Sequence, residues 1–305
     1  MKNPNEYVID KNITVKSYEE YQSLQMKMED SNLAFKELVR TGKSFCAAKM
    51  GFVEIVALNH YLSRPERSYN GIGGLMFVNA GIFPPTIKDF DDFCREYLGH
   101  ISHLDFFGMW VFGDEPQGVT EKEVYEKYAT NSKLVCAGCW DSYHYENPWT
   151  ENITGKKVLV ISPFAKTIQS QFKKRKLLWS NPKILPTFEL KTIKCPLSAG
   201  LLGESPYHSW VEGLKALKEE MEKTDFDVCF TSAGAWGLPL AVHAKRLGKI
   251  GVHAGGDLQL MFGIKGKRWD NNAERGGLWY NEHWVRPSDE ETPKNKNHIE
   301  NGCYW

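Results

Sequence analysis

The sequence predicts an α/β fold with a Rossmann-like, mostly parallel sheet flanked by helices, and three observations support that prediction. The run KKVLVIS at 156–162 is continuously apolar after its lysines, as in strands that are buried on both faces. After it, short apolar runs alternate with amphipathic stretches of helical period, which is the pattern of parallel strands joined by helices. The 305 residues, 42% hydrophobic and 25% charged, have the composition of a large globular domain.

The first half is predicted to begin with a helix. Residues 17–40 are charged, carry apolar side chains at helical spacing and are followed by Gly42, a residue type common at helix ends. The short apolar run SFCAAKM at 44–50 predicts a buried strand, and a helix over 52–63 is expected to follow Gly51. Further strands are expected at 103–112 and 133–138.

The second half alternates more regularly. The expected order is strand 156–162, helix 163–179, strand 188–193, helix 208–223, strand 226–234, helix 237–248 and strand 249–254. Parallel strands in such a series are joined by right-handed crossovers. Their carboxyl ends then lie along one edge of the sheet, where open α/β sheets bind ligands.

Three regions follow from this reading. Residues 1–43 form an N-terminal helical extension, 44–268 the Rossmann-like catalytic domain and 269–305 a C-terminal tail. The periodicity stops at Trp269, yet the tail holds four of the ten tryptophans. Because disordered segments are poor in aromatic residues, we expect the tail to pack across the domain as extended chain.

Charge and cysteine content limit the possible partners and the compartment. The net charge is zero, so the field of the whole molecule attracts neither nucleic acid nor membrane. The seven cysteines are odd in number and irregularly spaced, which favours reduced thiols in a cytoplasmic protein. Cys136 and Cys139 form a lone CxxC, for which packed thiols and half of a zinc site are the alternatives.

Membrane insertion is not expected. The N-terminus is polar, and no apolar run approaches the ~20 residues that a transmembrane helix needs. We therefore expect no transmembrane segment and a cytoplasmic location, with peripheral membrane association left open.

The first candidate site is AAKMGFVE, where a predicted strand meets a helix. Lys49 ends the strand, Gly51 makes the turn and Glu54 lies in the first helical turn. A carboxylate beside a lysine at such a turn can act as a base, bind a metal or orient a hydroxyl group. The alternative is an acidic residue that simply stabilises a helix N-terminus. Lys49 and Glu54 are our catalytic candidates, and Gly51 is a candidate for ligand binding.

Two more strand ends carry weaker signals. Ser162 suits a helix N-cap, and Lys166 lies one turn later, so a phosphate could bind the free N–H groups there. An ordinary helix cap explains the same residues. Gly234 and Gly237 form part of a dinucleotide fingerprint without its full GxGxxG, so they do not predict NAD. Close backbone packing is the alternative to ligand binding at these two glycines.

The segment HAGGDLQLMFGIKGKRWD provides the fourth candidate. Gly255 and Gly256 follow a predicted strand and let the backbone turn or approach a ligand. A cationic loop follows, and its Arg and Lys side chains can bind a phosphate. We therefore expect an anion site, with a nucleotide diphosphate as a suitable occupant, at Lys265, Lys267 and Arg268.

Several segments together resemble a known family. AAKMGFVE, VNAGIFPP, KKVLVISPFAKTIQSQ, LPTFEL, FDVCFTSAGAWGLPLAVHAKRLGKIGVHA, GGDLQLMFGIKGKRWD and the terminal NGCYW look like a family associated with surface-polysaccharide biosynthesis. The resemblance covers most of the chain from about residue 44 to Trp305, and the GGDLQLMFGIKGKRWD motif is highly specific to the family.

The chain is more distantly similar to the GT-D class of glycosyltransferases. That class combines a Rossmann-like sheet with a D-x-E motif in a segment R-F-G-D-G-E. Lys49 stands at the arginine of that segment, Glu54 at the final glutamate and Phe52 at the first acid. Since one carboxylate is a poor site for Mn²⁺ or Mg²⁺, the resemblance implies either no metal or a second ligand such as Asp257. No cofactor beyond that possible divalent metal is implied.

The resemblance implies a glycosyltransferase-like enzyme that moves a sugar from a nucleotide-sugar donor to a glycan or lipid-linked acceptor. The cationic loop would neutralise the leaving diphosphate in place of a metal. Its partners in donor binding would be Gly234, Gly237, Gly255, Gly256 and Gln259. Three tryptophans could stack on a base or sugar ring, or belong to the core, namely Trp236, Trp269 and Trp279.

The sequence also allows three other functions. One is another nucleotide-dependent enzyme on the same fold, such as a nucleotide-sugar-modifying enzyme or a methyltransferase. The second is a non-catalytic nucleotide- or glycan-binding component of the pathway, which the missing first acid favours. A serine or cysteine hydrolase has little support, because no GxSxG is present. A homo-oligomer is left open.

Overall fold

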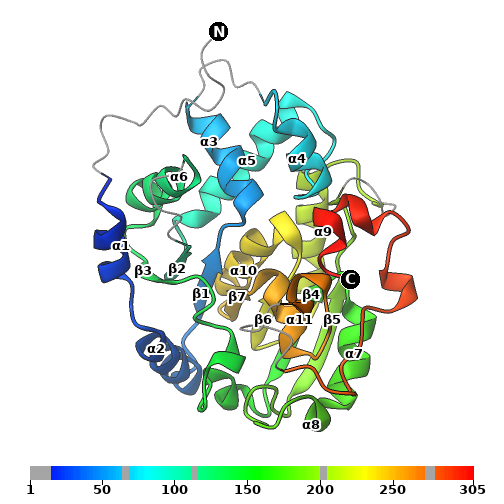
Figure 1. The fold of residues 1–305 in the computed structure, drawn as a ribbon. Coiled ribbons are helices and arrows are strands. Elements are labelled where there is room, and N and C mark those ends of the chain that lie inside the picture. The colour runs from blue at the N-terminus through cyan, green and yellow to red at the C-terminus, as the bar shows by residue number, and fades with distance from the viewer. Residues whose placement is uncertain (1–14, 64–68, 111–115, 200–204, 272–278) are drawn as a thin grey trace.

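A single parallel sheet organises the chain (Figure 1). The computed structural model describes residues 15–63, 69–110, 116–199, 205–271 and 279–305. In these ranges, the strands form a seven-stranded sheet in the order β3-β2-β1-β7-β6-β4-β5. They are β1 (Phe45–Lys49), β2 (Phe106–Met109), β3 (Lys133–Cys136), β4 (Lys157–Ser162), β5 (Glu189–Lys194), β6 (Val228–Thr231) and β7 (Ile250–His253). All neighbours pair in parallel, so the predicted α/β, Rossmann-like fold is confirmed.

Helices connect and flank the strands. They are α1 (Tyr18–Leu24), α2 (Met28–Thr41), α3 (Phe52–Ser63), α4 (Gly73–Val78), α5 (Ile87–Ile101), α6 (Pro116–Val124), α7 (Ala165–Lys173), α8 (Arg175–Leu178), α9 (Trp210–Glu222), α10 (Gly237–Arg246), α11 (Leu258–Met261) and α12 (Lys267–Asp270). None in the described ranges combines the length and the apolar character of a membrane-spanning segment.

The central strands are buried on both faces, as their apolar runs predict. Along β1, Cys46 and Ala48 face one hydrophobic core while Phe45 and Ala47 face a second one. The alternation follows from the twofold repeat of a strand. The strand β5 at the edge of the sheet has exposed and half-buried side chains instead, apart from the buried Ile193.

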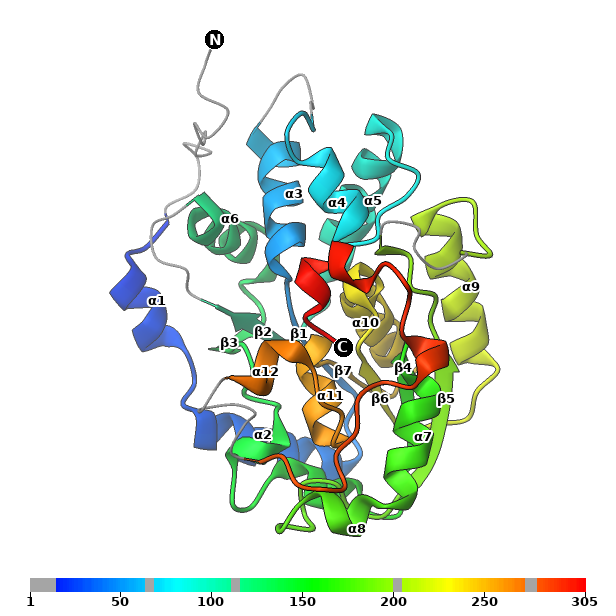
Figure 2. The ribbon, with the colours of Figure 1, turned by 45° about the vertical axis from the view of Figure 1, so that its right-hand side comes forward.

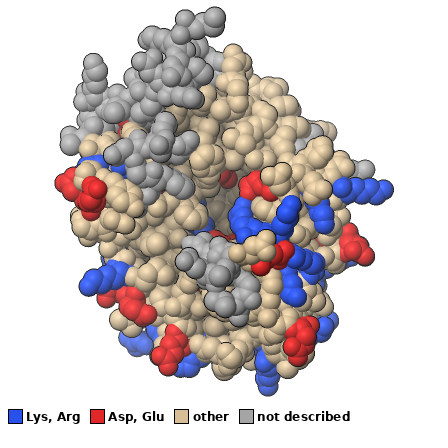
Figure 3. Space-filling view, viewed as in Figure 1, with Lys and Arg blue, Asp and Glu red and all other residues tan. Residues whose placement is uncertain are grey.

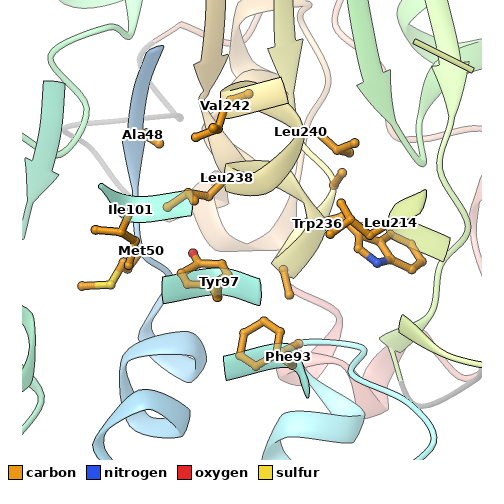
Figure 4. Close-up of a cluster of buried hydrophobic side chains, with 14 of the residues drawn as sticks. Ala48, Met50, Phe93, Tyr97, Ile101, Leu214, Trp236, Leu238, Leu240 and Val242 are labelled. Carbon is orange, nitrogen blue, oxygen red and sulfur yellow. The ribbon is translucent and has the colours of Figure 1, made fainter. Parts of the chain in front are cut away.

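The first core lies between the sheet and helices α5, α9 and α10. Figure 4 shows side chains from α5 meeting side chains from α10 and β1 in this core. Among those labelled are Ala48, Phe93, Tyr97, Trp236, Leu238 and Val242. The second core lies on the opposite face, where Phe35 of α2 stacks on Phe45 and Ile168 of α7 is buried. The molecule is thus a three-layer sandwich of helices, sheet and helices.

The helix expected over 17–40 is two helices, so that prediction is wrong. Gln25 is extended and ends α1, and its side-chain amide donates to the carbonyl of Met109 at 2.9 Å. Met26 forms an isolated parallel bridge with Val135 of β3. Bonding to the sheet edge therefore outweighs the local helical tendency of this stretch.

The C-terminal tail packs on the domain. It contains the 3-10 helices η7 (Asp289–Glu291), η8 (Lys296–His298) and η9 (Glu300–Gly302). Trp284 and Trp305 are buried in the second core, and Val285 bridges Ile264. Figure 2 shows the tail passing α7 and ending beside α11, and hydrogen bonds from the tail to both helices agree with that path.

Candidate functional site

A cavity of about 620 Å³ opens at the carboxyl edge of the sheet. Its lining includes residues at or just after the ends of β1, β4, β5, β6 and β7, together with the first turn of α3 and the end of the tail. Figure 3 shows a hollow near the centre of this face, with basic and acidic side chains side by side at its rim. A cavity of this size and place is typical of ligand sites in open α/β sheets.

Lys49 and Asp257 form a buried ion pair in this cavity. The Lys49 Nζ atom lies 2.9 Å from Asp257 Oδ2, and the two side chains are only 6% and 12% exposed. The ammonium also lies 4.5 Å from the centre of the Trp110 ring. The carboxylate that could have served as a second metal ligand therefore neutralises Lys49 instead.

Glu54 is a buried carboxyl group that lines the same cavity. It lies in the first turn of α3, and burial raises its pKa to about 7, with a smaller contribution from the negative charge of Glu300. Gly51 makes room for it, because a Cβ at position 51 would lie 2.2 Å from Glu54 Oε2. A carboxyl group that titrates near neutral pH can both give and take a proton.

Arg268 is held to the tail at the rim of the cavity. Its guanidinium donates to the carboxylate of Glu300, and Nη2 lies 3.3 Å from the hydroxyl oxygen of Tyr304. The Tyr304 ring lies under the guanidinium at 4.7 Å. Gln259 Nε2 donates to the backbone carbonyl of Tyr304 at 2.9 Å. Two residues of the segment 255–270, Gln259 and Arg268, therefore hold the end of the chain in place.

Among the described residues that line the cavity, two have basic side chains with a positive charge, and both are paired with carboxylates. Lys49 pairs with Asp257, and Arg268 pairs with Glu300. An anionic ligand would therefore have to exchange places with a carboxylate, most readily at the more exposed pair of Arg268.

The other two cations of the predicted anion site lie apart from the cavity. The Lys265 ammonium lies 5.4 Å from the Tyr280 ring centre, and the Lys267 ammonium donates to the carbonyl of Asn301 at 3.2 Å. Neither residue belongs to the cavity lining. The loop therefore brings Arg268 alone of its three basic side chains to the cavity.

Gly255 and Gly256 line the cavity, but side chains of the protein already lie against them. Gly255 has a φ of +66°, and a Cβ there would lie 3.4 Å from Lys49 Cε. A Cβ at Gly256 would lie 2.7 Å from the Tyr304 ring. The lack of a side chain at these two glycines leaves room for Lys49 and Tyr304, and the glycines also form part of the cavity wall.

The glycines after β6 differ from each other. Gly234 lines the cavity with a φ of +53°. Gly237 starts α10 outside the lining, and the ring of His253 fills the space beside it. Close packing therefore accounts for Gly237. Trp236 and Trp269 are buried in the two cores, and Trp279 packs against Tyr143 outside the cavity lining.

The predicted phosphate position after β4 is filled by a residue of the tail. The carboxylate of Glu291 accepts from the backbone N–H groups of Lys166 at 2.7 Å and Thr167 at 3.1 Å. Ser162 Oγ accepts from the N–H of Phe164, and the Lys166 ammonium pairs with Glu290. Glu291 thus supplies the negative charge that the amino terminus of α7 favours.

Replacing Glu291 with alanine should lower the free energy of unfolding by about 2–3 kcal/mol, because the buried N–H of Thr167 and the partly buried N–H of Lys166 lose a charged acceptor. Glu291 is 1% exposed. Urea unfolding measures the loss. Glu290→Ala is the matched control, since Glu290 is exposed and forms a surface ion pair with the exposed Lys166 side chain. Equal effects of the two substitutions would contradict the capping role of Glu291.

A divalent metal does not fit the residues at this site. The described residues contain no group of three His, Cys, Asp or Glu side chains placed to hold a metal ion. The apolar side chain of Phe52 offers no atom that binds a metal, and the carboxylate of Asp257 is paired with Lys49. Cys136 and Cys139 are free thiols among the described cysteines, with Cys139 buried.

Among the cavity residues that the sequence did not predict are His253, Glu300 and Tyr304. His253 is a polar residue at the carboxyl end of a strand. Lys49 was predicted on that ground, and His253 could have been predicted in the same way. Glu300 and Tyr304 lie in a tail without periodicity, where nothing in the sequence marks a residue as part of a cavity.

Comparison of the chain with family models, with curated proteins and with solved structures finds no match. The function is therefore inferred from the cavity and its residues.

Proposed function

We propose that the protein is a glycosyltransferase-like enzyme that transfers a sugar from a nucleotide-sugar donor to a glycan or lipid-linked acceptor in surface-polysaccharide biosynthesis. The observation that carries the proposal is Glu54, a buried carboxyl group whose pKa of about 7 suits a general base, in a cavity at the carboxyl edge of the sheet. The resemblance of the motifs to the polysaccharide family supports the choice of reaction.

In the proposed reaction, Glu54 takes the proton of the acceptor hydroxyl group. The acceptor oxygen bonds to the sugar as the bond between sugar and diphosphate breaks, and the electron pair of that bond stays with the diphosphate. Arg268 would leave Glu300 and pair with the diphosphate, because a guanidinium binds phosphate oxygens in a bidentate manner. The reaction as proposed needs no metal. It would take place in the cytoplasm, at the membrane surface where the acceptor is lipid-linked.

A thermal-shift screen against nucleotides and nucleotide sugars, with Mn²⁺ or with EDTA, tests donor binding. A ligand at 100 times its dissociation constant should stabilise the protein by about 2.7 kcal/mol. Arg268→Ala should weaken binding of the ligand about tenfold, and Glu300→Gln should strengthen it by removing the competing carboxylate. Lys267→Ala is the matched control and should leave binding unchanged, because Lys267 lies outside the cavity lining. Equal responses of Lys267→Ala and Arg268→Ala would argue against this placement.

The second candidate function is a non-catalytic nucleotide- or glycan-binding component. Phe52 at the place of the first acid and the paired state of both cavity cations favour it. Product analysis separates the candidates, since sugar transfer releases free nucleotide and binding does not. A different product from the same donor would point to another nucleotide-dependent enzyme on this fold.

A further inference from the structure

His253 is a buried histidine in the cavity wall that the proposed reaction does not use. It ends β7 between the neighbouring strands β1 and β6, and it is 6% exposed. Its ring nitrogens decide whether it can bind a cation, an anion or a neutral group.

The hydrogen bonds of Thr231 determine which ring nitrogen carries the proton. Thr231 Oγ1 donates to the backbone carbonyl of Gly237 at 2.8 Å, which uses its single proton. The same oxygen lies 3.1 Å from His253 Nδ1 and can only accept there. Nδ1 therefore bears the hydrogen, and Nε2 keeps its lone pair.

The ring is also fixed in direction. Its Nδ1–Cε1 edge packs on the backbone of Gly237, where a Cβ would lie 2.1 Å from both atoms. His253 lines the cavity, and because its Nδ1–Cε1 edge packs on Gly237, the Nε2–Cδ2 edge is the part of the ring that remains to face the cavity. Among the described residues, no hydrogen-bond partner of Nε2 is found.

We propose that His253 Nε2 is the acceptor of a subsite on the cavity floor that binds a hydroxyl group of the ligand. The identification of that hydroxyl as one of a sugar or ribose rests on the proposed function. Ser232 and the ion pair of Lys49 with Asp257 line the same cavity and offer further hydrogen-bonding atoms.

The electrostatics of the ring favour an uncharged donor over an anion. Burial, together with the positive charge of Lys49, lowers the pKa of His253 to about 3. The ring is then neutral across the physiological range and cannot pair with a phosphate as a cation. A site with a fixed, buried acceptor discriminates against ligands that lack the matching donor.

Nitrogen NMR of protein labelled at histidine tests the tautomer in the unliganded enzyme. The His253 signals are assigned by their loss in His253→Asn. At both pH 5 and pH 7 we expect a protonated Nδ1 and an unprotonated Nε2. A ring protonated at pH 5, or a hydrogen on Nε2, would overturn the assignment.

Two substitutions then separate binding from a structural role. The amide of His253→Asn can still reach Thr231 but places nothing at Nε2, whereas His253→Gln places an amide near Nε2. The ligand is the nucleotide sugar that binds most tightly in the thermal-shift screen. We expect His253→Asn to bind it about tenfold more weakly than the wild-type protein and His253→Gln to bind it almost as tightly as the wild-type protein. If both variants fold and lose the same amount of binding affinity, the proposed subsite is wrong.

The failure of the proposed function would look different from the failure of the subsite. If no nucleotide sugar binds the wild-type protein, the donor proposal fails. The NMR measurement still decides between the two tautomers of His253 in that case, because it needs no ligand.

Discussion

Replacing Lys49 with methionine is expected to destabilise the protein by about 3–5 kcal/mol, because it leaves the Asp257 carboxylate buried without its cation. The two side chains are 6% and 12% exposed, so water compensates little for the lost charge. Methionine keeps most of the volume that packs on Trp110, and the loss therefore reports charge more than packing. Urea unfolding at neutral pH measures the change.

The double variant Lys49→Met/Asp257→Asn isolates the charge effect. It removes both charges, so it should recover most of the stability that Lys49→Met loses. A loss below about 1 kcal/mol in Lys49→Met, or a double variant as unstable as the sum of the single ones, would contradict a tightly coupled pair.

The fold was predictable because its signals are local. The strands from 156 onward are apolar runs bounded by helical stretches, and β4, β6 and β7 lie within the predicted ranges. The helix of α3 begins directly after Gly51, as expected. Where a long-range contact competes with local tendency, as at Met26 beside β3, the prediction failed.

The site was predictable only in part, because its contacts join residues that are far apart in the sequence. Lys49, Glu54 and Arg268 follow from their chemistry at strand ends and in a basic loop, and all three line the cavity. Their partners could not be predicted, because Asp257 and Lys49 are 208 residues apart. The same holds for Glu291, which contacts Lys166 across 125 residues and takes the place predicted for a phosphate.

The substitution Glu54→Gln should abolish most sugar transfer while stabilising the protein at neutral pH and above. Loss of a general base costs about 10²–10⁴-fold in rate. Burial raises the folded-state pKa of Glu54 to about 7, above the usual value near 4.3 in the unfolded chain. Between these values the folded state holds more protons than the unfolded state, so the stability of the wild-type protein falls as the pH rises.

The pH dependence of stability provides a control for the Glu54→Gln prediction. Glutamine has no charge to bury, so the two proteins should be about equally stable near pH 4 and should differ by about 3–4 kcal/mol near pH 8, with Glu54→Gln the more stable. Urea unfolding at several pH values measures the difference, and the thermal-shift screen shows whether donor binding persists. A parallel pH dependence of the two proteins would contradict the raised pKa. Full activity in a folded Glu54→Gln protein would exclude Glu54 as the base, whereas a wild-type protein that binds nucleotide sugars and releases no nucleotide would favour the binding component.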